Sequence, residues 1–144
     1  MRKELQQRLF DACPLFYRYQ SMDKREESLH DLMDLDLCCG DGWYPLLLDV
    51  SMKIEMICEQ MKKQGYDKYD LPVAVWIKEK YGELCIHMDN ETSDTVVLQD
   101  KAEALSATTC EACGQVGKMV NKSWITCLCE GCHKHYPLGG DVGD

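Results

Sequence analysis

The chain has 144 residues, a formal net charge of -9 and a pI near 4.9, with 45% hydrophobic and 28% charged residues. This is the composition of a soluble protein with one domain, or one domain and a small appended module, and no window approaches the roughly 18 apolar residues that suggest a membrane span. The acidic excess disfavours binding to nucleic acid, which needs clustered Lys and Arg, and favours a partner with a basic surface.

The charge is uneven along the chain. Residues 107–144 contain three lysines and four acidic residues, which leaves 13 basic and 21 acidic residues in residues 1–106, a net charge of -8. Residues 1–7 have no apolar segment of the kind found in signal peptides, so we expect a cytoplasmic protein. In a reducing cytoplasm the ten cysteines are expected to be metal ligands or buried thiols rather than disulfides.

The N-terminal part begins with a predicted helix over residues 2–12. Its residues Leu5, Leu9 and Ala12 recur at three- and four-residue steps and should face the core. Residues 15–37 carry no single period, and their aromatic start fits either a strand or a buried loop.

A longer helix is predicted over residues 43–64. Asp41 precedes it and can accept hydrogen bonds from the free backbone N–H groups of the first turn, where Pro45 is also tolerated. Apolar residues recur along this segment at three- and four-residue steps, which is the stripe of an amphipathic helix. The stripe consists of Trp43, Leu46 or Leu47, Val50, Ile54, Ile57 and Met61.

The apolar period then changes from helical to alternating. Residues 73–80 and 83–88 alternate apolar and polar side chains around a turn at Tyr81-Gly82, which predicts a β-hairpin. A polar loop follows and supplies an N-cap for a helix over residues 94–106. We expect three residues of this helix to point inward: Val97, Ala104 and Leu105.

Four cysteines form the strongest motif of the sequence. Cys110 and Cys113 are separated by two residues, as are Cys129 and Cys132, and fifteen residues lie between the pairs. This spacing is typical of zinc ribbons and knuckles, because two tight turns can each bring two thiolates to one tetrahedral ion. Gly114 suits such a turn. Four protein ligands would leave no open coordination position, which predicts a single structural Zn²⁺.

The choice of ligands has alternatives. Cys127, His133 and His135 lie close to the second pair in sequence, and sites with three cysteines and one histidine are common. Residues 118–120 and 123–125 are predicted to be short strands that connect the two pairs.

Several motifs in combination resemble those of one protein family. They are Gly40-Asp41-Gly42-Trp43, KEKYGEL at 78–84, AEALS at 102–106, the Cys-x-x-Cys-Gly-x-x-Gly of 110–117 and WITCLC at 124–129. Together they are similar to those of small uncharacterised zinc-knuckle proteins encoded in bacteriophage and prophage genomes. The resemblance covers about residues 1 to 135.

The chain departs from this family at two places. The family often has an Arg-aromatic pair where this chain has Cys85-Ile86, and a His where this chain has Cys132. The first difference puts a shared surface role of that strand in doubt, whereas the second exchanges one zinc ligand for another. The resemblance implies a phage origin and expression in the cytoplasm of an infected bacterium, and it brings no catalytic residues.

The expected architecture is α+β, with helices packed on a small antiparallel β-hairpin sheet and a zinc knuckle at the C-terminal end. We predict an acidic α+β domain over residues 1–106, a zinc-binding knuckle over 107–136 and a disordered, Gly-rich tail over 137–144.

The expected function is that of an acidic, non-enzymatic protein that binds and modulates a host protein through a basic surface of that partner. The partner would be a protein that handles nucleic acid or serves in host defence. An alternative is a nucleic-acid-binding regulator that uses four residues of the knuckle: Lys118, Lys122, Lys134 and Trp124. A further alternative is a metal-dependent nuclease, with His87, Asp89 and Glu91 on one strand face.

Overall fold

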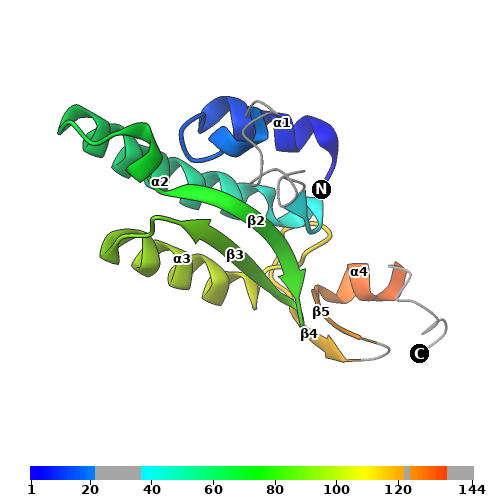
Figure 1. Cartoon of the computed structure of the whole chain (residues 1–144). Coiled ribbons are helices and arrows are strands. Elements are labelled where there is room, and N and C mark those ends of the chain that lie inside the picture. The colour runs from blue at the N-terminus through cyan, green and yellow to red at the C-terminus, as the bar shows by residue number, and fades with distance from the viewer. Residues whose placement is uncertain (22–36, 122–123, 136–144) are drawn as a thin grey trace.

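The computed structural model describes residues 1–21, 37–121 and 124–135, and within these ranges it confirms an α+β fold (Figure 1). The α-helices are α1 (Lys3–Ala12), α2 (Tyr44–Lys63), α3 (Ser93–Ser106) and α4 (Glu130–His135). The strands are β1 (Leu37–Cys38), β2 (Val73–Lys80), β3 (Glu83–Asp89), β4 (Lys118–Asn121) and β5 (Ile125–Leu128). Short 3₁₀ helices are η1 (Arg18–Ser21), η3 (Asp41–Trp43) and η4 (Lys68–Asp70).

The predicted N-terminal helix is confirmed as α1. Leu5 and Leu9 are buried as expected, but Ala12 is exposed, so its predicted inward position was wrong. The inward stripe continues by a four-residue step to Cys13, whose backbone N–H donates to the carbonyl of Leu9 at 3.0 Å and whose side chain is fully buried.

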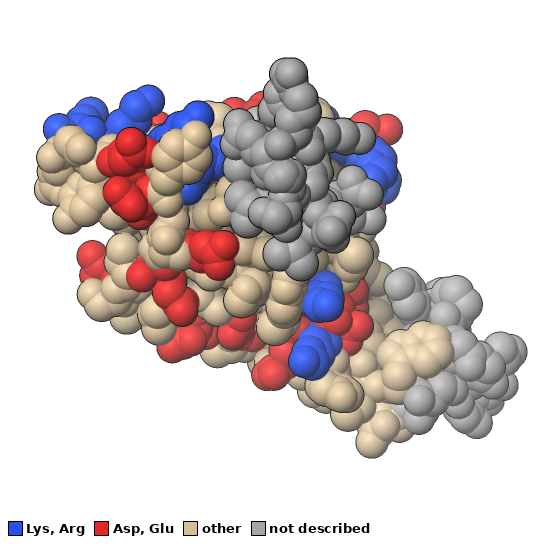
Figure 2. Space-filling view, viewed as in Figure 1, with Lys and Arg blue, Asp and Glu red and all other residues tan. Residues whose placement is uncertain are grey.

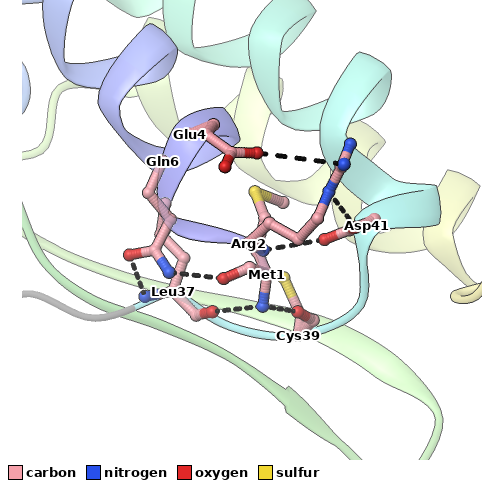
Figure 3. Close-up of polar contacts among 7 residues, drawn as sticks. All are labelled: Met1, Arg2, Glu4, Gln6, Leu37, Cys39 and Asp41. Carbon is pink, nitrogen blue, oxygen red and sulfur yellow. Dashed lines mark hydrogen bonds and ion pairs between the residues drawn. The ribbon is translucent and has the colours of Figure 1, made fainter.

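Polar contacts attach the start of α1 to β1 and η3 (Figure 3). The Gln6 side-chain amide accepts a hydrogen bond from the Leu37 backbone N–H at 3.2 Å and donates one to the Met1 carbonyl at 2.6 Å. The Asp41 carboxylate accepts from the Arg2 backbone N–H at 2.8 Å and forms an ion pair with the Arg2 guanidinium at 2.7 Å. The N-cap position of α2 is Trp43 and makes no side-chain cap hydrogen bond, so the predicted role of Asp41 as the cap of this helix was wrong.

The long predicted helix is confirmed as α2, with Pro45 in its first turn. Four residues of its apolar stripe are buried, and Ile57 and Met61 are half-buried. Glu55, which the apolar stripe does not include, is also buried, because its carboxylate accepts backbone hydrogen bonds from Leu15 and Phe16 at 3.0 and 2.8 Å. The buried residues of the stripe are Trp43, Leu47, Val50 and Ile54, with Leu46 beside them.

The segment after α1 is a buried loop rather than a strand. Phe16 and Tyr17 are fully buried, and the Phe16 carbonyl accepts a hydrogen bond from the Ala74 backbone N–H at 2.8 Å. Of the two alternatives for the start of residues 15–37, a strand or a buried loop, the buried loop is therefore correct. Residues 22–36 lie outside the described ranges.

The predicted hairpin is confirmed as β2 and β3. Its turn residues Tyr81 and Gly82 both have positive φ, 54° and 85°, which is the geometry of a tight two-residue hairpin turn. The sheet also contains β1, which lies parallel to β2 with Leu37 opposite Ile77. The predicted antiparallel hairpin sheet therefore has an additional parallel edge strand, which was not predicted because a two-residue strand leaves no period in the sequence.

The last predicted helix is confirmed as α3, which begins with a capping box between Thr92 and Thr95. Its orientation was predicted wrongly, since Val97 and Leu105 are 50% and 56% exposed and Ala104 is exposed as well. This orientation results from polar residues at the inward positions, because their side chains form hydrogen bonds with the backbone at the free edge of β3.

Three side chains of α3 reach that edge. Ser106 Oγ accepts from the Leu84 backbone N–H at 2.8 Å, and Glu103 Oε2 accepts from the Ile86 backbone N–H at 3.0 Å. Gln99 Nε2 donates to the Ile86 carbonyl at 2.8 Å. The helix thus takes the place that a further strand would occupy.

Two apolar clusters lie within the described residues. The larger one joins α1, α2, the β1–β2–β3 sheet and the inner side of α3. The smaller one lies in the C-terminal part around Cys110, Val120 and Leu128, where β4 and β5 form an antiparallel pair. The second short strand begins at Ile125, two residues later than predicted, and the 137–144 tail lies outside the described ranges.

Within the described ranges, no helix combines the length and apolar character that crossing a bilayer requires.

Candidate metal centre

The four motif cysteines converge in space. The sulfur atoms of Cys110, Cys113, Cys129 and Cys132 all lie within 4.8 Å of one another, and those of Cys113 and Cys129 are 3.6 Å apart. Among the residues that the structure describes, no other set of three or more Cys, His, Asp or Glu side chains converges in this way. They could therefore hold one metal ion.

Two turns position these thiols. The first pair lies in the turn between Thr109 and Val116, which form an isolated β-bridge. Within this turn the Cys110 backbone N–H donates to the Gln115 carbonyl at 2.7 Å. Gly114 closes this turn with a φ of 85°, a conformation that side-chain-bearing residues rarely adopt, as the sequence predicted. The second pair lies where β5 ends and α4 begins, so that Cys132 comes one helical turn after Cys129.

The spacing of the sulfurs fits a tetrahedral ion. Four metal–sulfur bonds of about 2.3 Å place neighbouring sulfurs about 3.8 Å apart in a tetrahedron. The distance of 3.6 Å between Cys113 and Cys129 is close to this value. Thiolate donors favour soft or borderline ions such as zinc over calcium or magnesium, which prefer oxygen.

The electrostatics of the site are also compatible with a bound cation. Burial opposes ionisation of Cys110, but backbone N–H groups of Cys129, Cys113 and Ala112 lower its pKa to about 7. A hydrogen bond with the Cys113 thiol, together with burial, raises the pKa of Cys132 to about 12. The first thiolate is thus stabilised while further ionisation is opposed, and a bound divalent ion would balance the additional negative charges.

The metal loop is attached to the core through a segment that lies 66 to 71 residues earlier in the chain. Gly42 N–H donates to the Glu111 carbonyl at 2.7 Å, and Gly40 N–H donates to the Glu111 carboxylate at 2.8 Å. The indole N–H of the buried Trp43 donates to the Thr109 carbonyl at 2.8 Å. Two of the sequence motifs, residues 40–43 and the cysteine turn, are therefore in direct contact.

Glycine is required at this contact for steric reasons. A Cβ on Gly42 would lie 2.3 Å from the Cys110 carbonyl oxygen and 2.6 Å from that of Glu111. The sequence analysis did not identify Glu111. Its carboxylate also accepts a hydrogen bond from the Thr126 hydroxyl at 3.3 Å. Burial raises the pKa of this carboxyl group. The position of Glu111 between two ligand cysteines was the signal in the sequence that could have identified it.

Two of the three alternative ligands, Cys127 and His133, do not join the group. Cys127 is buried, and its thiol donates to the Ala107 carbonyl at 3.3 Å. Burial raises the pKa of Cys127 to about 11, which keeps it a neutral thiol. His133 is on α4 and its Nε2 atom is buried, but its ring is not part of the converging set. The side chain of His135 lies outside the described parts of the structure.

The residues of the nuclease alternative do not form a site. His87 and Asp89 are exposed on β3, and Glu91 is exposed in the following loop. The His87 ring stacks on Trp76 with a centroid distance of 5.1 Å. These three side chains are not among the groups that converge on a possible metal position within the described residues.

Three of the four knuckle residues of the nucleic-acid alternative lie within the described residues. Lys118 and Trp124 are exposed, whereas Lys134 forms an ion pair with Glu130 at 3.8 Å. Lys122 lies outside the described residues.

Comparisons of the chain with protein-family models, with curated proteins and with solved structures found no match.

Proposed function

We propose that the four cysteines bind one structural Zn²⁺ and that the protein is a non-enzymatic binding protein with an acidic contact surface. The convergence of four thiols supports a closed site, because four protein ligands leave no position for water or substrate. In this proposal zinc stabilises the C-terminal module and takes no part in a reaction.

The acidic surface is the observation that carries the binding function. Residues 83–106, which form β3 and α3, contain six acidic residues and a single basic one, Lys101. Figure 2 shows Asp and Glu side chains spread over this part of the molecule. Five of the six are exposed: Glu83, Asp89, Glu91, Asp94 and Asp100. Such a surface speeds encounter with a basic partner and repels acidic ones.

We propose a host protein as the partner, in the cytoplasm of a bacterium infected by a phage. The motif resemblance to phage and prophage proteins supports this setting. A host protein that handles nucleic acid, including one that does so in defence, binds phosphate groups through clustered Lys and Arg, and an acidic protein can occupy such a surface. The partner is thus expected to lose its access to nucleic acid when bound.

The test is an affinity capture from bacterial lysate, with partners identified by mass spectrometry and then purified. One variant neutralises the acidic surface through Asp89→Asn, Glu91→Gln, Asp94→Asn and Asp100→Asn. A matched control removes four exposed charges elsewhere through Asp11→Asn, Glu59→Gln, Asp70→Asn and Glu130→Gln.

The wild type and the control should bind the purified partner, and the surface variant should bind it at least about tenfold more weakly. Binding should also weaken as salt rises from about 0.1 to 1 M, since the screening length falls from about 10 to 3 Å. Equal affinity of the partner for the wild type and the surface variant, together with an affinity that does not change with salt, would overturn the proposal. Direct, specific capture of an oligonucleotide would favour the nucleic-acid alternative instead.

A further inference from the structure

The four cysteines of the metal centre differ in their access to solvent. Cys110 is buried, Cys129 and Cys132 are half-buried, and Cys113 is exposed. The Sγ atoms of Cys113 and Cys129 are 3.6 Å apart, although the two residues are separated by sixteen positions in the chain. A disulfide has a sulfur–sulfur distance of about 2.05 Å, so these two sulfurs need to approach by only about 1.5 Å to form one.

The other accessible thiols cannot form a disulfide with each other. Cys38 on β1 is exposed and Cys85 on β3 is half-buried, and both lie opposite Lys78 on the central strand β2. Two strand spacings of about 4.8 Å separate their Cα atoms by about 10 Å, whereas a disulfide needs less than about 7 Å. The remaining thiols outside the metal centre are buried: Cys13, Cys39, Cys58 and Cys127.

We propose that a peroxide oxidises Cys113 and Cys129 to a disulfide and thereby releases the metal ion, an inference that rests on the zinc site proposed above. The thiolate is the form of cysteine that reacts with peroxide, and metal ligation keeps the ligand cysteines as thiolates. Cys113 is oxidised first because it is the exposed member of the group.

The reaction has two steps, and hydrogen peroxide is the oxidant. The Cys113 thiolate attacks one oxygen, the O–O bond breaks, and a sulfenic acid and a hydroxide ion form. The Cys129 thiolate attacks the sulfur of this sulfenic acid, the S–O bond breaks, and a second hydroxide ion leaves. Two protons from solvent convert both hydroxide ions to water. Two thiolates have then lost two electrons, which the peroxide has gained.

Oxidation removes two of the four ligands. Cys110 and Cys132 remain, and two thiolates leave half of the tetrahedron without protein ligands, so the ion is lost to solvent. The new bond connects the turn of residues 109–116 with the junction of β5 and α4, which are the two segments that the ion connects in the reduced protein. Peroxide thus exchanges a metal cross-link for a covalent one.

The experiment uses the full-length, reduced, zinc-loaded protein and a single equivalent of hydrogen peroxide. A metal-binding dye measures the zinc released per chain. The remaining thiols are then blocked with N-ethylmaleimide, and the protein is digested with trypsin.

Peptide mapping by mass spectrometry identifies the oxidised pair. Cleavage after lysine places Cys113 in the peptide of residues 102–118 and Cys129 in the peptide of residues 123–134. The proposed disulfide joins these two peptides, and fragmentation assigns the linked cysteines. A disulfide between Cys110 and Cys113 would instead stay within the first peptide.

The control variant is Cys38→Ser with Cys85→Ser, which removes the two accessible thiols outside the metal centre and leaves all four ligands in place. Wild type and control should both release about one zinc ion per equivalent of peroxide, and both should contain the disulfide between Cys113 and Cys129.

Each other result overturns a defined part of the inference. Retention of zinc by the peroxide-treated wild type overturns the exchange, as does release that is lost in the control variant. Release together with a different oxidation product overturns the assignment of the pair. Absence of zinc from the reduced protein before peroxide is added overturns the zinc site itself, which separates failure of the proposed function from failure of the redox response.

Discussion

Glu103 on α3 accepts a hydrogen bond from the backbone N–H of Ile86 on β3, with an Oε2–N distance of 3.0 Å. Together with Gln99 and Ser106, this contact lets a helix satisfy the backbone of an edge strand that would otherwise be open to pairing with another chain. It also determines which side of α3 is left for solvent.

Replacement of Glu103 should destabilise the fold. Glu103→Ala leaves the Ile86 N–H without its acceptor, which should cost about 1–3 kcal/mol in the free energy of unfolding. Glu103→Gln keeps an acceptor oxygen and should cost less. Urea unfolding measures both, with the exposed Asp100→Ala as a control expected to stay within about 0.5 kcal/mol of wild type. An unchanged stability of Glu103→Ala would show that the contact does not hold α3 in place.

Substitution of a ligand cysteine should abolish tight metal binding. Cys129→Ser removes one of four converging thiols, and its effect should exceed the loss of about 10–100-fold that is typical of a residue supporting a ligand. Cys127→Ser is the matched control, because its thiol donates to the Ala107 carbonyl and a serine hydroxyl can do the same.

Metal content per chain, measured by elemental analysis after competition with a chelator, separates the two variants. Cobalt substitution adds a spectroscopic readout, since tetrahedral cobalt–thiolate sites absorb strongly. Retention of one metal per chain by Cys129→Ser, or its loss by Cys127→Ser, would contradict the assigned ligand set.

A side chain at Gly42 should separate the metal loop from the core. The Cβ of Gly42→Ala would lie 2.3 Å from the Cys110 carbonyl oxygen, so the backbone must move and the hydrogen bond to Glu111 is lost. We expect a destabilisation of more than about 2 kcal/mol. Gly131→Ala is the control: nothing lies within 4 Å of its Cβ, and alanine favours the helix by up to about 1 kcal/mol.

Thermal melting of the zinc-loaded protein compares these two glycine variants. A melting temperature of Gly42→Ala equal to that of wild type would mean that the loop can dock by another route.

Stability should fall at alkaline pH because of three buried thiols. Burial raises the pKa of Cys13, Cys39 and Cys58 to about 12, from the value of 9.0 expected in the unfolded chain. Above about pH 9 the unfolded state therefore holds fewer protons than the native state, and the free energy of unfolding decreases with pH. The stabilising effect is complete below pH 9 and is lost progressively as pH rises toward 12.

Urea unfolding at a series of pH values tests this dependence. The decrease should be at most about 1.4 kcal/mol per pH unit for each thiol, and Cys58→Ala should make it shallower. The same three thiols should react slowly with thiol reagents in the native protein. A stability that is constant between pH 8 and 11 would contradict the burial of these groups as neutral thiols.

The elements with a clear period were predictable from the sequence. The stripe of α2, the alternation of the hairpin and the spacing of the four cysteines each depend on local chemistry, and the structure places all three as expected. β1 was not predictable, because two residues cannot display a period. Its position depends on Ile77, forty residues later in the chain.

Two errors have a shared cause. Val97 and Leu105 were expected to face the core because apolar residues usually do, but hydrogen bonds from the edge of β3 orient the helix by its polar residues. Asp41 was expected to cap the following helix, but Arg2 binds its carboxylate instead. In both cases a partner distant in sequence prevailed over a local preference.

The contact between residues 40–43 and the cysteine turn makes the two parts of the chain depend on each other. If residues 1–106 were produced alone, the backbone N–H groups of Gly40 and Gly42 and the indole N–H of Trp43 would lose their acceptors. Separate expression of the halves should therefore yield an aggregation-prone fragment and a poorly folded knuckle, whereas mixing the two in the presence of metal should restore a soluble complex.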